Sequence, residues 1–195
     1  MKNLLLMLLI FVSFSTTAQF NKGRILVGGN VGFSSTTSKS KFGSSSAYTT
    51  SKSSEFSFTP QAGYFIIDNL AIGAGLNLEL TTLKPEADVF DEVSTALLFQ
   101  PFVRYYIKPG VFFQGAYGIG SQKDKQTYQD VTQEQKYGAR NWLFAVGYAI
   151  FLNDRVAVEP MLGYKTSTLK NKDADSKSWD SSLFFKVGLQ VYLRD

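Results

Sequence analysis

The sequence of 195 residues predicts an all-β protein, an eight-stranded antiparallel up-and-down transmembrane β-barrel. Three observations lead to this fold class. Apolar residues alternate with small or polar ones along eight segments, short and long connections alternate between those segments, and the 17 Phe and 10 Tyr are spread along the whole chain. Alternation with a period of two is the pattern of a pleated strand with two different faces. After the N-terminal segment no stretch shows the 3.6-residue period of an amphipathic helix.

The N-terminal segment has the order of regions found in a secretory signal peptide. Lys2 precedes an apolar run over residues 4–14, and the small residues of 15–18 follow it. Because the apolar run is shorter than the roughly 20 residues that a spanning helix needs, it is not interpreted as an anchor. We therefore predict a signal peptide over 1–18 and one barrel domain over 19–195.

The third and the last expected strands show the alternation most clearly. One face of the third strand is wholly apolar, and it consists of Leu70, Ile72, Ala74, Leu76, Leu78 and Leu80. The opposite face is small or polar. The same pattern places the eight strands, in chain order, near 24–33, 56–66, 70–81, 97–107, 111–119, 142–150, 156–164 and 182–193.

The connections between these segments differ in length. Tight turns are expected at Asp68-Asn69, at Lys108-Pro109-Gly110 and at Asn153-Asp154, where turn-forming residues separate two strands. Long polar loops are expected near 34–54, 82–93, 121–138 and 169–180. Short turns at one end and long loops at the other match bacterial outer-membrane barrels, in which the turns and both termini face the periplasm.

Three features favour a membrane barrel over a soluble one. Gly and Ala dominate the polar faces, which suits the narrow interior of an eight-stranded barrel. A strand of about 11 residues, tilted by about 40°, rises about 28 Å and crosses an apolar band of roughly 25 Å. Aromatic residues on the apolar faces gather near both strand ends, as interfacial girdles do. Pro60, Pro101 and Pro160 interrupt strands, and we expect local bulges or kinks there.

Two segments carry a family resemblance. The run Gly-Tyr-x-x-x-Asp-Asn-Leu-Ala-Ile-Gly spans residues 63–73, and the last strand carries Lys186, Gly188, Val191 and Leu193 in a polar-x-Gly-x-x-apolar-x-apolar pattern. The chain resembles the OmpA/OmpX-type small outer-membrane β-barrels. The resemblance implies a bacterial outer-membrane location, lipid and lipopolysaccharide around the barrel, and recognition of the last strand by the barrel assembly machinery. The chain ends Leu193-Arg194-Asp195, whereas family members often end on an aromatic residue.

The composition argues against chemistry. The chain has no histidine and no cysteine, and these residue types supply most general bases and thiolate sites. We therefore expect no enzyme activity, no cofactor and no metal site. The net charge is only +4 and no dense Lys/Arg block is present, so nucleic acid is not an expected partner.

The strand assignment points five charged residues into the lumen: Glu79, Arg104, Glu159, Lys165 and Lys186. Buried charges need partners to be tolerated. We expect Arg104 to pair with Glu159 near the turn end, and Glu79 to pair with Lys165 or Lys186 nearer the loop end. Such pairs fill and rigidify the lumen, and the alternative is that they gate a narrow path for ions or water.

The function predicted from the sequence is that of an integral outer-membrane barrel with a structural or surface-interaction role, a filled lumen and no general porin activity. One alternative is a barrel component of a secretion or assembly complex, and another is a soluble periplasmic ligand-binding β-barrel. The first loop carries Lys39, Lys41 and Lys52, which suit contact with lipopolysaccharide or a surface partner protein, although a solvated Ser/Thr-rich loop is the simpler interpretation.

Overall fold

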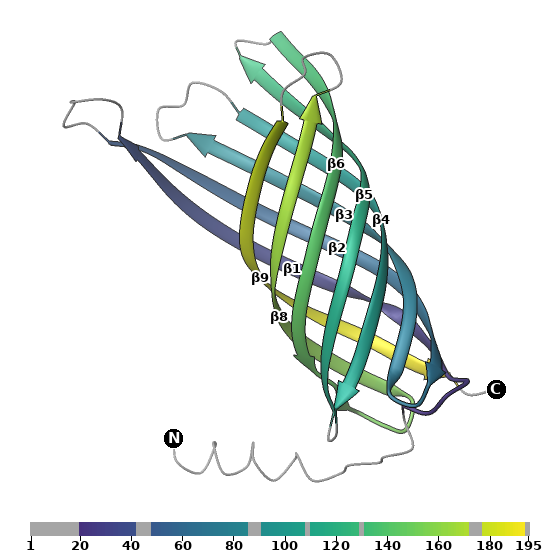
Figure 1. The fold of residues 1–195 in the computed structure, drawn as a ribbon. Helices are drawn as coiled ribbons and strands as arrows, with labels where there is room; N and C mark the ends of the chain where they lie inside the picture. Colours follow the sequence, from purple (N-terminus) through teal and green to yellow (C-terminus); the bar gives the residue numbers. More distant parts are fainter. Residues whose placement is uncertain are drawn as a thin grey trace, which may run out of the picture.

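The computed structural model describes residues 20–41, 48–85, 91–107, 110–128, 131–171 and 177–193. These residues form one antiparallel sheet that closes into a tilted barrel (Figure 1). β1 pairs with β9 as well as with β2, which closes the sheet. The strands are β1 (Ile25–Lys41), β2 (Tyr48–Ile67), β3 (Leu70–Pro85), β4 (Asp91–Ile107), β5 (Val111–Tyr128), β6 (Val131–Tyr148), β7 (Ile150–Phe151), β8 (Val156–Asn171) and β9 (Lys177–Leu193). In this part of the chain no helix is long and apolar enough to cross a membrane.

The barrel has the eight strands that the sequence predicts, because β6 and β7 are two parts of one strand. Gly147 of β6 pairs with Met161 of β8, and Ile150 of β7 pairs with Val158, so both parts keep the same register against β8. The ladder is interrupted only opposite Glu159 and Pro160. A proline nitrogen carries no hydrogen to donate, which accounts for the gap.

The other two in-strand prolines behave in the same way. Pro60 pairs with Gly29 of β1 but has no ladder partner on β3, and Pro101 pairs with Ala74 of β3 but has none on β5. Beyond each gap the strands resume their earlier register. The expected bulges at these prolines are therefore wrong: each proline breaks the pairing on one side without shifting it. A register shift does occur in β2, between Phe65 and Ile67.

The two faces of the wall are opposite in character to those of a soluble barrel. Large apolar side chains on the outer face are open to the surroundings, with Leu76 50% and Phe144 61% exposed. Charged and amide side chains point inward, and Arg104 and Glu159 are fully buried. A soluble ligand-binding barrel has an apolar interior and a polar exterior, so that alternative is wrong.

The strands extend well beyond the apolar band. On β5 the outer face changes from Ile119 to Ser121 and then Lys123, yet pairing with β6 continues to Tyr128, which lies opposite Val131. The expected loop over 121–138 is therefore mostly a paired hairpin, and the ends of the other three expected loops are also paired strand. Outside the bilayer the outer face meets water, so the apolar alternation ends although the backbone ladder does not. The stretches 42–47, 86–90, 129–130 and 172–176 lie outside the described residues.

Two of the predicted tight turns are present at the opposite end of the barrel, where β1 begins and β9 ends (Figure 1). Asp68 and Asn69 join β2 to β3, and Asn69 has a φ of 66°, a left-handed conformation that asparagine tolerates. In the second turn the Asn153 Oδ1 accepts hydrogen bonds of 2.9 Å from the backbone N–H groups of Arg155 and Val156. The third predicted turn lies largely outside the described residues, since only Gly110 of it is described.

Candidate functional site: the barrel lumen

The lumen is the candidate site because every strand sends polar side chains into it. Inward positions are occupied by charged groups at two levels and by amides between them. The lower level lies near the tight turns and the upper level near the long hairpins. An eight-stranded barrel has an interior only wide enough for side chains, so these groups contact one another across it.

The lower level is a hydrogen-bonded network around Arg104 of β4. Its Nη1 lies 2.6 Å from the Glu159 Oε2 of β8 and donates a 2.9 Å hydrogen bond to the Tyr106 hydroxyl. The Arg104 Nε donates a 2.8 Å hydrogen bond to the Gln114 Oε1. The Tyr192 hydroxyl of β9 donates to the Glu159 Oε1 and lies 3.0 Å from the Tyr106 hydroxyl. The network therefore links four strands across the lumen.

Aromatic rings pack around this network on the turn side. The guanidinium carbon of Arg104 lies 4.3 Å from the centre of the Phe112 ring, close enough for a cation–π interaction. Phe20, which precedes β1, stacks on Tyr106 with ring centres 4.1 Å apart and is only 6% exposed. The Phe20 carbonyl accepts a 2.7 Å hydrogen bond from the Asn69 N–H, which fixes this segment to the first turn. The turn end of the lumen is thus filled by rings.

Amide side chains occupy the middle of the lumen. The Asn30 Nδ2 donates a 3.2 Å hydrogen bond to the Gln61 Oε1, and the Gln190 Nε2 donates a 3.3 Å bond to the Asn30 Oδ1. On the other side the Gln100 Nε2 donates a 3.3 Å bond to the Asn141 Oδ1. These residues are buried, so the middle of the lumen is packed with polar but uncharged groups.

The upper level contains two carboxylates and two lysines. The Lys165 Nζ of β8 lies 2.9 Å from the Glu79 Oε1 of β3 and 3.2 Å from the Glu55 Oε1 of β2. The Asn77 Nδ2 donates a 2.9 Å hydrogen bond to the Glu79 Oε1 and so connects this level to the amides below. Lys165 and Lys186 are the two expected partners of Glu79, and Lys165 is the one that forms the ion pair. Lys186 forms no ion pair within the described residues.

The stem of the Lys186 side chain lies over Gly32 on the inner face of the barrel wall. A Cβ on Gly32 would lie 2.6 Å from the Ser57 Oγ and 2.8 Å from the Lys186 Cγ, so only glycine leaves room for the lysine stem. The Lys186 Nζ lies 5.5 Å from the centre of the Phe184 ring. Glycine at position 32 therefore has a packing role opposite β9, with which it pairs at Lys186.

Several members of these clusters are not among the residues predicted from the sequence. Glu55 borders the expected loop over 34–54, yet it shares the odd-numbered inward face of Ser57 and Thr59, so one more step of the alternation places it in the lumen. Tyr106 and Tyr192 occupy inward positions next to Arg104 and Gln190, but no sequence pattern shows that their hydroxyls meet Glu159. Phe20 carries no alternation signal because it precedes the first strand.

The described residues of the lumen form polar contacts between strands. The described residues include no group of three or more His, Cys, Asp or Glu placed to hold a metal ion. Apart from Lys186, the charged groups of the two levels are engaged with one another and with amides or phenols. What the arrangement does physically is to join distant strands through buried polar contacts.

A closed antiparallel barrel with an apolar outer band, a polar interior, short turns at one end and long hairpins at the other defines a bacterial outer-membrane β-barrel protein. The model of the outer membrane protein beta-barrel domain matches residues 71–195. The chain belongs to this family and lies in the bacterial outer membrane.

Solved structures of small outer-membrane barrels share the fold. Ail, the attachment invasion locus protein of Yersinia pestis, is 10% identical, with a TM-score of 0.50 over 88% of this chain and 98% of that one. Neisserial surface protein A is 15% identical, with a TM-score of 0.49 over 87% of this chain and 97% of the other. No curated protein sequence matches the chain. At these identities the likeness concerns the fold alone.

Proposed function

We propose that this protein is a closed, non-catalytic outer-membrane barrel whose lumen does not conduct and whose projecting hairpins supply a surface for contact with other molecules. The observation that carries the proposal is the network around Arg104 and Glu159. It spans the lumen from β4 to β8 with both side chains fully buried, and Phe20 packs beneath it. The absence of histidine from the chain supports a role without catalysis.

Conductance measurements test the closed lumen. Reconstituted in planar bilayers, the wild-type protein is expected to show no single-channel steps. Glu79→Ala is expected to be silent as well, because that substitution leaves the Arg104 network below it intact. Regular openings in the wild type would overturn the proposal, and openings that appear only in Glu79→Ala would favour the gating interpretation of the upper ion pairs.

The hairpins supply the proposed contact surface. The β5–β6 hairpin stays paired from the membrane band out to Tyr128 and Val131, so it projects as an ordered element. Its outward lysines and glutamate are exposed, and the Lys125 Nζ lies 2.8 Å from the Glu134 Oε1. An ordered polar surface of this kind costs less entropy to bind than a loose loop.

The absence of cysteine makes the orientation directly testable. Lys123→Cys places a thiol on the β5–β6 hairpin, and Asn153→Cys places one in a tight turn. A membrane-impermeant maleimide added to intact cells is expected to label the first variant and not the second. After cell lysis both should react. Labelling of Asn153→Cys alone in intact cells would reverse the orientation and remove the hairpins from the cell surface.

We also propose that β9 carries the signal for the barrel assembly machinery through Lys186, Gly188, Val191 and Leu193. Lys186 and Gly188 are buried toward the lumen, whereas Leu193 is exposed on the outer face at the turn end. Leu193→Asp is expected to reduce the folded fraction in cells without preventing refolding into detergent in vitro. Ile107→Asp, an outer-face position at the same end of β4, is the matched control. Equal losses for the two variants would contradict a specific signal.

A further inference from the structure

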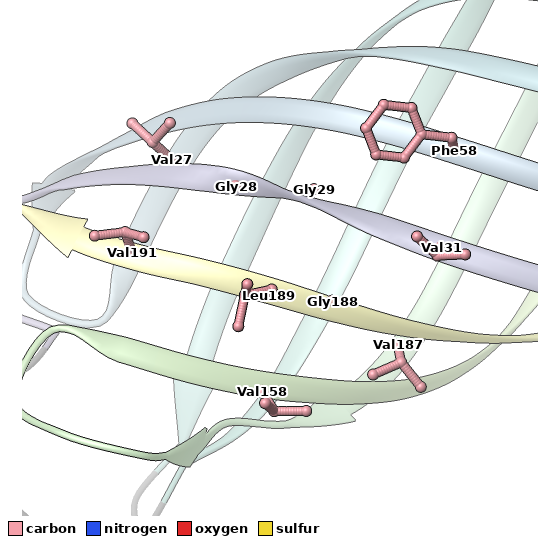
Figure 2. Close-up of a pocket in the computed structure, with 10 residues that line it drawn as sticks. All are labelled: Val27, Gly28, Gly29, Val31, Phe58, Val158, Val187, Gly188, Leu189 and Val191. Atoms are coloured by element: carbon pink, nitrogen blue, oxygen red, sulfur yellow. The ribbon is translucent and has the colours of Figure 1, made fainter.

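A groove runs along the outer wall of the barrel where β1 passes between β2 and β9 (Figure 2). Its volume is about 610 Å³. It is lined only by glycine and apolar residues: Val27, Gly28, Gly29, Val31, Phe58, Val158, Val187, Gly188, Leu189 and Val191. The groove contains no side chain that can donate or accept a hydrogen bond, so its occupant must be a hydrocarbon surface.

The groove exists because a glycine stands where the alternation calls for a large apolar side chain. Gly29 occupies an outer-face position between Val27 and Val31, and it pairs with Leu189 on one side and Pro60 on the other. In Figure 2, β1 carries no side chain at Gly29, between Val27 and Val31, and Leu189 lies on the neighbouring strand β9. The hollow therefore has a floor of backbone and walls of branched aliphatic groups.

The groove lies at the middle of the membrane band. On β1 the outer face is apolar from Ile25 to Phe33, and Gly29 is halfway between these two residues. Bilayer hydrocarbon surrounds this level, and an empty hollow would lose dispersion contacts along its walls. An acyl chain that lies along the groove restores those contacts.

Two cationic side chains lie at the turn end of the same sector. Arg155 immediately precedes β8, and Val158 lines the groove three residues further, roughly 10 Å along the strand. Lys22 lies just before β1, beside the β2–β3 turn, where its backbone N–H donates a 2.8 Å hydrogen bond to the Asp68 carboxylate, and the side chains of Arg155 and Lys22 are both exposed. Neither forms an ion pair within the described part of the chain. Arginine and lysine are the residues that bind phosphate, so an anionic headgroup fits this position.

We propose that the groove seats one acyl chain of a phospholipid from the leaflet at the turn end of the barrel, which is the periplasmic leaflet in the orientation proposed above, with the phosphate near Arg155. Gly29 leaves the space for the chain, and Arg155 supplies a cationic partner for a phosphate-bearing headgroup. The lipid is bound non-covalently on the outer face of the barrel, along β1 between β2 and β9.

Native mass spectrometry of protein extracted from outer membranes in mild detergent tests this site. The wild type is expected to retain one phospholipid, and Gly29→Leu, which fills the groove, is expected to lose it. Gly115→Leu is the matched control, because Gly115 on β5 also faces outward and a Cβ there has no atom nearer than 3.9 Å. Arg155→Glu is expected to weaken retention, whereas Arg140→Glu at the opposite interface is not. Each variant must first show the heat-dependent gel shift of a folded barrel.

Three outcomes would overturn the proposal. They are equal lipid retention by Gly29→Leu and the wild type, a retained mass that corresponds to lipid A, and a wild-type dimer that Gly29→Leu abolishes. If Gly29→Leu does not fold, the proposal is tested on the wild-type protein alone. Its methyl NMR signals are recorded in micelles that contain dipalmitoylphosphatidylglycerol and an analogue with a spin label on the acyl chain. The methyl signals of Val31 and Leu189 should broaden more than that of Val146 on the outer face of β6. Equal broadening at all three residues would refute binding in the groove.

Discussion

Removing the positive charge from the lower lumen network should destabilise the barrel strongly. Arg104→Met keeps an unbranched side chain of similar length but leaves the Glu159 carboxylate without its only cationic partner among the described residues. Glu159 keeps the hydroxyls of Tyr106 and Tyr192, which cannot neutralise its charge. Breaking a fully buried pair by removing one partner costs about 3–5 kcal/mol, which shifts the unfolding equilibrium by roughly two to four decades.

The assay is equilibrium urea unfolding in lipid vesicles, followed by the fluorescence of the two tryptophans and by the gel shift of the folded form. Combining Arg104→Met with Glu159→Gln removes the unpaired charge and should restore much of the lost stability, so the two substitutions are not additive. Lys125→Met breaks the exposed pair with Glu134 and should leave the unfolding midpoint at the wild-type value. A loss below about 1 kcal/mol for Arg104→Met would refute the reasoning that the network needs its charge partner.

Three further substitutions test other parts of the wall and the lumen. Gly32→Val should cost about 1–3 kcal/mol in the same unfolding assay because its side chain displaces the Lys186 stem, while Gly115→Ala on the open outer face should be close to neutral. Phe20→Ala should cost about 3–5 kcal/mol by emptying the ring stack, yet stay silent in planar bilayers because the Arg104 network remains; conductance would show that Phe20 is the seal. Leu76→Arg at mid-band should cost about 2–4 kcal/mol and Thr95→Arg beyond the band about 0–1 kcal/mol, and equal costs would mean that the band is misplaced.

The membrane-spanning part of the fold was predictable because its signal is local. Each strand repeats the contrast between lipid outside and packed side chains inside, so alternation along residues such as Leu76, Leu78 and Leu80 reveals both faces at once. The apolar alternation, however, ends before the strands do. Beyond Ile119 or Trp142 the outer side chains meet water, and the backbone ladder that continues there leaves no apolar pattern to detect.

The prolines show how backbone and side-chain signals differ. Pro60, Pro101 and Pro160 each remove one donor, from which the sequence predicts a bulge. The closed sheet instead holds each proline in register through its intact pairing on the other side, with Gly29, Ala74 and Val187 as the respective partners. Whether a proline shifts the register therefore depends on pairing with a neighbouring strand, and a local sequence pattern does not show that pairing.

By itself, the sequence determined the number of membrane strands, the face each residue presents and the inward direction of the five charged groups, because these depend on the parity of position along a pleated strand. Only the tertiary structure decided which groups meet. Arg104 and Glu159 are 55 positions apart, and their contact depends on the stagger between strands and on the closure of β1 on β9. The choice of Lys165 for Glu79, the addition of Glu55 and the packing of Phe20 beneath Tyr106 have the same origin. Register and closure arise from all the strands together, so these contacts cannot be derived from any one of them.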